Sequence, residues 1–293
     1  MDSAYIQEVM KYSKKDALIA ICVVLLVIPL MALRPIAAIL PIDWHAVPIY
    51  IALIVAWPLE KVIITIVPVT IIILVMKQGF ASVGIHKENL WKAVCLGFIV
   101  SLIPIFWGIL PIILYGGEFA GFGLFTALLI RTFIMAIAED VVFVGYLQTR
   151  LYGIFKSDIA AISVGAAFFS FMHVPMWLRT GLLNFDDLLS FGFMVILWFI
   201  MHFVLVALYR RYNSLIAVTI FHTLANFMVS PYMIWIFADE YVGYAGAWAQ
   251  TSGLFIPVAV GIWVLVRYLR WRRSKKLVKP YQAKRAKTRN HQR

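Results

Sequence analysis

Two adjacent carboxylates, Glu139 and Asp140, lie inside a long apolar segment of this sequence that runs from about residue 122 to residue 147. A carboxylate at membrane depth is costly unless a partner or water compensates for its lost hydration, so such acids are rare and mark ion pathways or chemistry. Further polar side chains lie within the later apolar segments, namely His173, His202, His222 and Asn226. Any chemistry in these segments would depend on this set of side chains.

The combination of a carboxylate, imidazoles and an amide is suited to hydrolysis. A glutamate can take a proton from water, and an imidazole can hold that water or protonate a leaving amine. An Asn side chain or an imidazole can donate to a developing oxyanion. A metal is the alternative, because Glu139, His173 and His222 would form an adequate zinc set. The sequence has no His-Glu-x-x-His helix, and the ligands would come singly from separate segments, so we expect no cofactor.

The composition places these residues in a membrane protein. Hydrophobic residues make up 63% of the 293 residues and charged residues only 14%, and apolar runs of about 20 residues recur along the chain. We predict an all-α polytopic bundle of about eight transmembrane helices. The predicted spans are residues 17–40, 48–76, 92–115, 122–149, 158–177, 187–209, 214–236 and 247–269. Cys22 and Cys95 both lie in apolar runs, which predicts buried packing residues.

The net charge of +12 is concentrated at the C-terminal end of the chain. Residues 267–293 contain twelve Lys or Arg and no acid, which leaves a body with 14 basic and 14 acidic residues. A basic tail after a span is typical of an anchor against anionic lipid headgroups, so we expect membrane lipid and no nucleic acid as a partner. Of the basic residues in the predicted loops and tails, 22 fall on the side of the termini and one on the other, which predicts that both termini are cytoplasmic.

The predicted spans place the polar residues at similar depths. Counted from the cytoplasmic end of each span at about 1.5 Å per residue, Glu139 lies roughly 16 Å deep, His222 roughly 13 Å, Asn226 roughly 19 Å and His173 roughly 24 Å. We therefore predict that these four converge on one functional cavity. His202 is shallower, at roughly 10 Å, and on its own can be read as a cap on a backbone carbonyl.

These residues, in this order, resemble the motifs of the CPBP family of intramembrane proteases, which includes the CAAX prenyl endopeptidases and the Abi-type bacteriocin-processing proteins. The family's Glu-Glu-x-x-x-Arg motif is matched by residues 139–147, EDVVFVGYL. Its Phe-x-x-x-His motif is matched by Phe169 and His173, and its His-x-x-x-Asn motif by His222 and Asn226. The resemblance covers roughly residues 122–230.

The resemblance implies a glutamate-dependent endopeptidase. In such an enzyme Glu139 activates water, His173 helps to hold it, and His222 with Asn226 stabilises the oxyanion. The supporting residues that we expect are Asp140, Phe143, Phe169 and His202. The implied substrate is a lipidated or membrane-embedded peptide, for instance a prenylated CAAX-type chain, that is cut near its C-terminus.

The sequence departs from the family pattern at two positions. Asp140 replaces the second Glu, and Val144 replaces the Arg. Because an unpaired buried charge is costly, Asp140 needs another partner, for which Lys61 or Arg34 from another span could serve. Arg131 is a poor substitute, since nine residues along a helix places it on the opposite face.

Two other functional classes follow from the same features. The loss of the motif arginine is compatible with a catalytically impaired member that acts as a membrane scaffold or as an immunity or regulatory protein. Acids and histidines at mid-depth are also found in small-solute transporters, but the chain shows no internal repeat and the polar groups all lie in its second half, which disfavours transport.

We predict four regions from these patterns. Residues 1–121 form the first three spans, and residues 122–236 form the catalytic core of spans four to seven with the three motifs. Residues 237–269 contain the last span, and residues 270–293 form the basic cytoplasmic tail.

Overall fold

The computed structural model describes residues 3–33, 48, 51, 54–55, 57–180, 188–228 and 235–236. The predicted last span, the basic tail and Arg34 lie outside the described residues.

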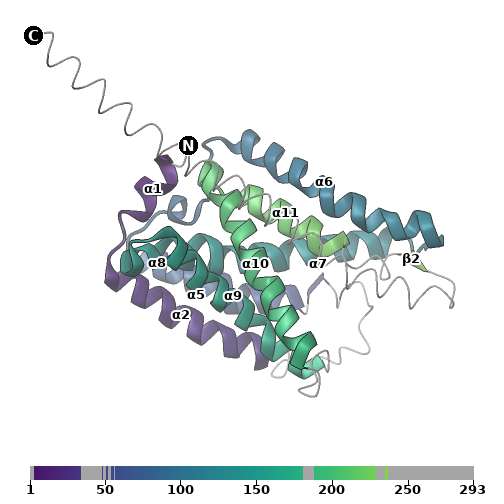
Figure 1. Ribbon diagram of the computed structural model, residues 1–293, viewed down its shortest axis with the longest axis horizontal. Coiled ribbons are helices and arrows are strands. Elements are labelled where there is room, and N and C mark those ends of the chain that lie inside the picture. The colour runs from purple at the N-terminus through teal and green to yellow at the C-terminus, as the bar shows by residue number, and fades with distance from the viewer. Residues whose placement is uncertain are drawn as a thin grey trace, which may run out of the picture.

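The described chain is mostly helical (Figure 1). Its helices are α1 (Ser3–Val9), α2 (Lys14–Leu33), α5 (Trp57–Val75), α6 (Leu90–Tyr115), α7 (Phe122–Asp140), α8 (Gln148–Phe155), α9 (Asp158–Thr180), α10 (Leu188–Tyr212) and α11 (Leu215–Met228), with a 3-10 turn η2 (Phe80–Val83) and a π-helical turn η3 (Val141–Leu147). The prediction of an all-α chain misses one small element. Strands β1 (Glu118–Phe119) and β2 (Trp235–Ile236) pair antiparallel.

Four helices in the described part of the chain are long and apolar enough to cross a membrane. These segments are Pro58–Val75, Leu90–Tyr115, Asp158–Pro175 and Met194–Tyr212. Their outward faces carry large apolar side chains, such as Phe106 and Ile99 on α6, which are more than half exposed in the isolated chain. Apolar surface of this kind suits contact with lipid, where no water has to be excluded.

Both cysteines correct a prediction from the sequence. Cys22 on α2 and Cys95 on α6 are free thiols, but they are exposed on the surface of the bundle and not buried in it. The reason is physical: the outward face of a membrane helix is as apolar as its inward face. An apolar neighbourhood in the sequence therefore does not predict burial in this class of protein.

The predicted span at residues 122–149 is interrupted by a change of helical geometry. Helix α7 ends at Asp140, directly after the two carboxylates, and the π-helical turn η3 follows. At its end the backbone N–H of Gln148 donates to the carbonyl of Phe143, five residues earlier. Every residue of η3 is buried. Short π-helical turns inside helices are rare and occur frequently at functional sites.

The elements around η3 position the polar residues. Helix α11 packs along α6 and also contacts α7, α10 packs along α9, and α5 packs against α7. Figure 1 shows α6 and α11 along one edge of the bundle and α2 along the opposite edge. Gly145 in η3 allows a close approach to the loop of η2, because a Cβ at this position would lie 2.7 Å from the carbonyl oxygen of Val83. The end of α7 is thus enclosed by several helices.

Candidate active site

Asp140 is fully buried at the end of α7 and binds two side chains of α11. The Nδ1–H group of His222 donates to Asp140 Oδ1 over 2.9 Å, and the hydroxyl of Thr219 donates to Oδ2 over 3.0 Å. Both carboxylate oxygens are therefore engaged. These contacts hold the His222 ring in one orientation and give the fully buried acid partners without the motif arginine.

Glu139 faces a different helix and a different cation. Lys61, the fifth residue of α5, forms an ion pair with Glu139 Oε1. Of the two cations expected as partners for Asp140, Lys61 pairs with Glu139 instead, and Arg34 lies outside the described residues. Successive residues of a helix point about 100° apart, so Asp140 faces α11 while Glu139 also reaches α5.

His222 lies between the two acids. Its Nε2 atom is 3.8 Å from Glu139 Oε2, beyond hydrogen-bond distance, while its Nδ1 atom contacts Asp140. Nε2 is buried and has no hydrogen-bond partner in the described part of the chain. A buried polar atom without a partner calls for an explanation, and here it adjoins a carboxylate oxygen. A water molecule or a substrate oxygen could lie beside both His222 Nε2 and Glu139 Oε2 and bridge them.

His173, on α9, contacts one residue of its own helix and one of α10. Its Nδ1–H group donates to the carbonyl of Phe169 over 2.8 Å, and its ring stacks on Trp198 with centroids 4.0 Å apart and planes 10° apart. A carbonyl oxygen can only accept a hydrogen bond, so Nδ1 carries the proton. In the neutral ring, the lone pair is then at Nε2.

Phe169 connects the histidines. Its buried ring lies in edge or tilted contact with five others, and the centroid distances are 5.6 Å to Phe143, 5.2 Å to His173, 5.9 Å to Trp198, 5.4 Å to His202 and 6.1 Å to His222. These rings come from η3, α9, α10 and α11. The side chain of Phe169 therefore sets the spacing between the elements that carry the polar residues.

His202 contacts a side chain and not the backbone carbonyl that the sequence predicts. Its Nε2 atom is 3.1 Å from Oε1 of Gln148, the first residue of α8, and both side chains are fully buried. Gly165 on α9 makes room for this pair, because a Cβ there would lie 2.3 Å from Gln148 Oε1. His202 thus joins α10 to α8 behind Phe169.

The remaining motif positions differ in their surroundings. Val144, which stands where the family pattern has Arg, is fully buried within η3. Asn226 is half-buried on α11, one turn beyond His222. In the part of the chain that the structure describes, no group of three His, Cys, Asp or Glu side chains is arranged to hold a metal ion. Among the motif residues, Glu139, Asp140 and His222 form a contact chain.

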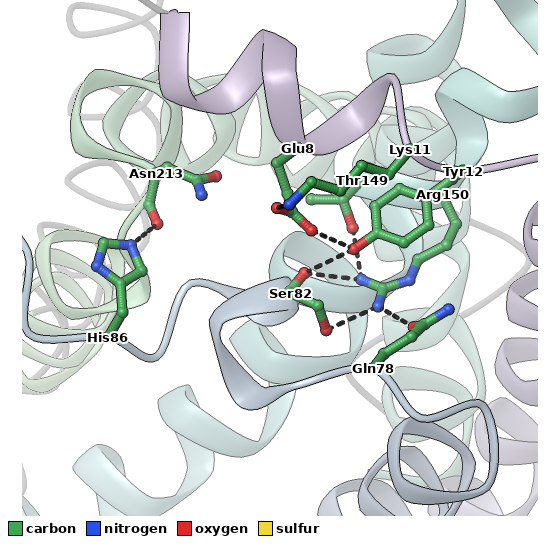
Figure 2. Close-up of polar contacts among 9 residues, drawn as sticks. All are labelled: Glu8, Lys11, Tyr12, Gln78, Ser82, His86, Thr149, Arg150 and Asn213. Carbon is green, nitrogen blue, oxygen red and sulfur yellow. Dashed lines mark hydrogen bonds and ion pairs between the residues drawn. The ribbon is translucent and has the colours of Figure 1, made fainter.

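A second buried polar cluster surrounds Arg150, on the α8 side of η3 (Figure 2). The guanidinium donates to the carbonyl and hydroxyl of Ser82 over 2.9 Å each, to Gln78 Oε1 over 2.5 Å and to Thr149 Oγ1 over 2.7 Å. It also lies 3.3 Å from the carbonyl oxygen of Gly145 in η3. One buried cation thus ties the loop before α6 to the π-helical turn.

The N-terminal helix joins the same cluster. The Arg150 guanidinium lies over the rings of Tyr12 and Tyr146, 4.2 and 4.5 Å from their centroids. The Tyr12 hydroxyl donates to Glu8 over 2.5 Å. Burial raises the pKa of Tyr12 and lowers the pKa of Arg150. Arg150 counts among the basic residues of the predicted loops, and this role was not predicted for it; the polar triplet of residues 148–150 after the first motif is the signal that could have found it.

Part of the chain is similar to a family of known proteins. Residues 121–228 match a family model described as Rce1-like, type II CAAX prenyl endopeptidase Rce1-like. The search of curated proteins found no match for the chain. The matched region contains α7, η3 and α8–α11, and with them Glu139, Asp140, His173 and His222. Together with the four apolar helices, this similarity indicates an integral membrane protein, and over residues 121–228 it supports a relationship to the CAAX-type proteases.

Proposed function

We propose that this protein is a glutamate-dependent intramembrane endopeptidase that hydrolyses a peptide bond near the C-terminus of a membrane-associated, CAAX-type prenylated substrate. The observation that carries the proposal is the contact chain from Asp140 through His222 to Glu139, which lies within the region matched by the family model. It places a carboxylate, an oriented imidazole and a buried unpartnered ring nitrogen at one point.

Glu139 is the general base in this proposal. Water attacks the scissile carbonyl carbon while a Glu139 oxygen accepts its proton, and a tetrahedral oxyanion forms. The proton passes from Glu139 to the leaving amine as the carbon–nitrogen bond breaks, which yields a carboxylic acid and an amine. His173 holds the attacking water through Nε2, because its Nδ1–H group is engaged by Phe169. No metal or other cofactor takes part.

The oxyanion is stabilised from α11. Because Nδ1 of His222 is held by Asp140, a hydrogen bond from this ring to the reacting oxygen comes from Nε2, in the doubly protonated form. Asn226 adds its amide from the next turn of the same helix. Donors that are fixed before the reaction stabilise developing charge without a reorganisation cost, and Asp140 acts here by positioning His222.

We infer that the site opens to the cytoplasm. The strong excess of Lys and Arg on the side of the termini favours cytoplasmic termini and eight spans. In that topology the substrate peptide reaches Glu139 from the cytoplasmic side while its lipid stays in the bilayer.

Replacing His173 with alanine tests the proposal. In purified protein in lipid nanodiscs, we expect His173→Ala to lower kcat for a prenylated CAAX peptide roughly 10- to 100-fold, because the attacking water loses one of its contacts. His86→Ala is the matched control, since His86 contacts the carbonyl of Asn213 in a loop outside the site. The readout is product formation measured by mass spectrometry. Unchanged cleavage in His173→Ala would contradict the proposed role.

A second function is favoured by the position of Lys61. An ammonium paired with the proposed base, together with an apolar residue at position 144, also fits a family member that binds a peptide without cutting it. Such a scaffold or immunity protein would keep its cellular phenotype in Glu139→Gln. Loss of the phenotype in Glu139→Gln, with normal protein abundance, would favour the enzyme.

A further inference from the structure

The ion pair between Lys61 and Glu139 occupies one oxygen of the proposed base. Glu139 Oε1 is held by the Lys61 ammonium, while Oε2 lies 3.8 Å from His222. The side chains of Lys61 and Glu139 are only 10% and 8% exposed, so little water reaches the ion pair. In this arrangement a water molecule has access to Glu139 chiefly at Oε2. Freeing Oε1 requires the ammonium to move to another anion, because an unpaired buried charge is costly.

A CAAX-type substrate carries such an anion close to the scissile bond. The motif is the last four residues of a chain, so a cut within it lies at most three residues from a free α-carboxylate. Three extended residues span about 10 Å. An α-carboxylate that enters an apolar site needs a cation as its partner. A substrate whose C-terminus lies elsewhere would not bring this charge.

Lys61 can reach that charge but cannot serve both anions. Its ammonium is a compact charge on a flexible four-carbon stem, so it can change partners by changing rotamers. With the scissile carbonyl beside Glu139, a carboxylate about 10 Å away along an extended chain is too far for one ammonium to contact both acids. Binding of the carboxylate therefore withdraws the ammonium from Glu139.

We propose that Lys61 binds the C-terminal carboxylate of the substrate and releases Glu139 when it does so. This inference rests on the proposed function for its substrate class. It makes Lys61 the residue that selects free C-termini. It also frees Oε1 of the base when a substrate is bound.

Peptide binding tests the inference without depending on cleavage. The probes are two fluorescent prenylated CAAX tetrapeptides that differ only in a C-terminal carboxylate or carboxamide. In Glu139→Gln, which leaves Lys61 without its acid, we expect the full chain in nanodiscs to bind the carboxylate peptide about 10- to 100-fold more tightly than the amide. In Glu139→Gln/Lys61→Met, we expect the two peptides to bind equally. This double variant leaves no buried charge from the pair, so its folding is not compromised by an orphan ion.

Lys92 provides the matched control. It is an exposed lysine on α6, and Glu139→Gln/Lys92→Met should keep the full preference for the carboxylate. A preference that survives in Glu139→Gln/Lys61→Met overturns the inference, and so does the absence of any preference in Glu139→Gln.

Cleavage by the wild-type chain separates this inference from the proposed function. A carboxylate preference in binding with no cleavage would leave the assignment of Lys61 standing and overturn the endopeptidase. Cleavage of both peptides at equal rates, with no preference in binding, would support the endopeptidase and overturn the assignment of Lys61. Faster cleavage of the carboxylate peptide by the wild-type chain, together with the Lys61-dependent preference, supports both.

Discussion

Replacing Asp140 with asparagine lowers kcat for a prenylated CAAX peptide by about 100-fold or more while the protein stays folded. Asp140 accepts the Nδ1–H group of His222, and an amide at this position can instead present its NH₂ group to the ring. The proton of the neutral ring would then move to Nε2, and the doubly protonated form would lose the carboxylate that supports it. Asparagine has nearly the same shape, so the packing against Thr219 and α11 is retained.

The matched control for this substitution is Asp158→Asn. Asp158 pairs with Arg210 over 3.0 Å at a partly exposed position, 26% exposed at the side chain, where an ion pair contributes at most about 1 kcal/mol. Steady-state kinetics of both variants, with unfolding midpoints in the same detergent, check the expectation. If Asp140→Asn kept its kcat, the orientation of His222 would not matter for turnover and the proposed role of Asp140 would be wrong.

Replacing Arg150 with methionine lowers the free energy of unfolding by at least about 3 kcal/mol. The substitution removes the donors to both oxygens of the buried Ser82 and to the amide oxygen of the partly buried Gln78. It also removes the cation between the rings of Tyr12 and Tyr146. Methionine fills part of the space, so the loss is mainly one of hydrogen bonds and charge.

Arg211→Met is the control for Arg150→Met. Arg211 is exposed at the end of α10, and surface substitutions of this kind usually change stability by less than about 0.5 kcal/mol. The measurement is equilibrium unfolding of both variants in mixed micelles, followed by circular dichroism. Equal stability of Arg150→Met and the wild-type chain would contradict the view that Arg150 ties the N-terminal helix and η2 to η3.

Most of the helical framework could be predicted from the sequence. Apolar runs of about 20 residues with polar turns between them predict helices, and the predicted spans at residues 92–115 and 158–177 correspond to α6 and α9. The candidate site could also be predicted in outline, because polar side chains are costly in hydrocarbon. Glu139, His173 and His222 lie at similar predicted depths, and polar side chains at such depths are stable only when they contact one another or water. The structure brings Glu139 and His222 together.

The partners within the site could not be predicted, because they depend on rotation about each helix axis. Depth along a span follows from counting residues, but which acid faces Lys61 depends on how α5 and α7 pack. The π-helical turn after Asp140 rotates every later residue, and no local composition signal marked it. The burial of Arg150 depends on loop η2, which is far away in the sequence. The failed prediction for the cysteines has a different cause, since lipid and protein interior select the same residue types.

The most direct test of the account is cleavage of a prenylated CAAX peptide with a free C-terminus by the purified wild-type chain and by Glu139→Gln in nanodiscs. The substitution keeps the shape of residue 139 but removes its ability to accept a proton. We expect a loss in kcat of about 1,000-fold or more, within the range that general-base catalysis contributes, with the carboxylate peptide still bound. Cleavage by Glu139→Gln at the rate of the wild-type chain would contradict it.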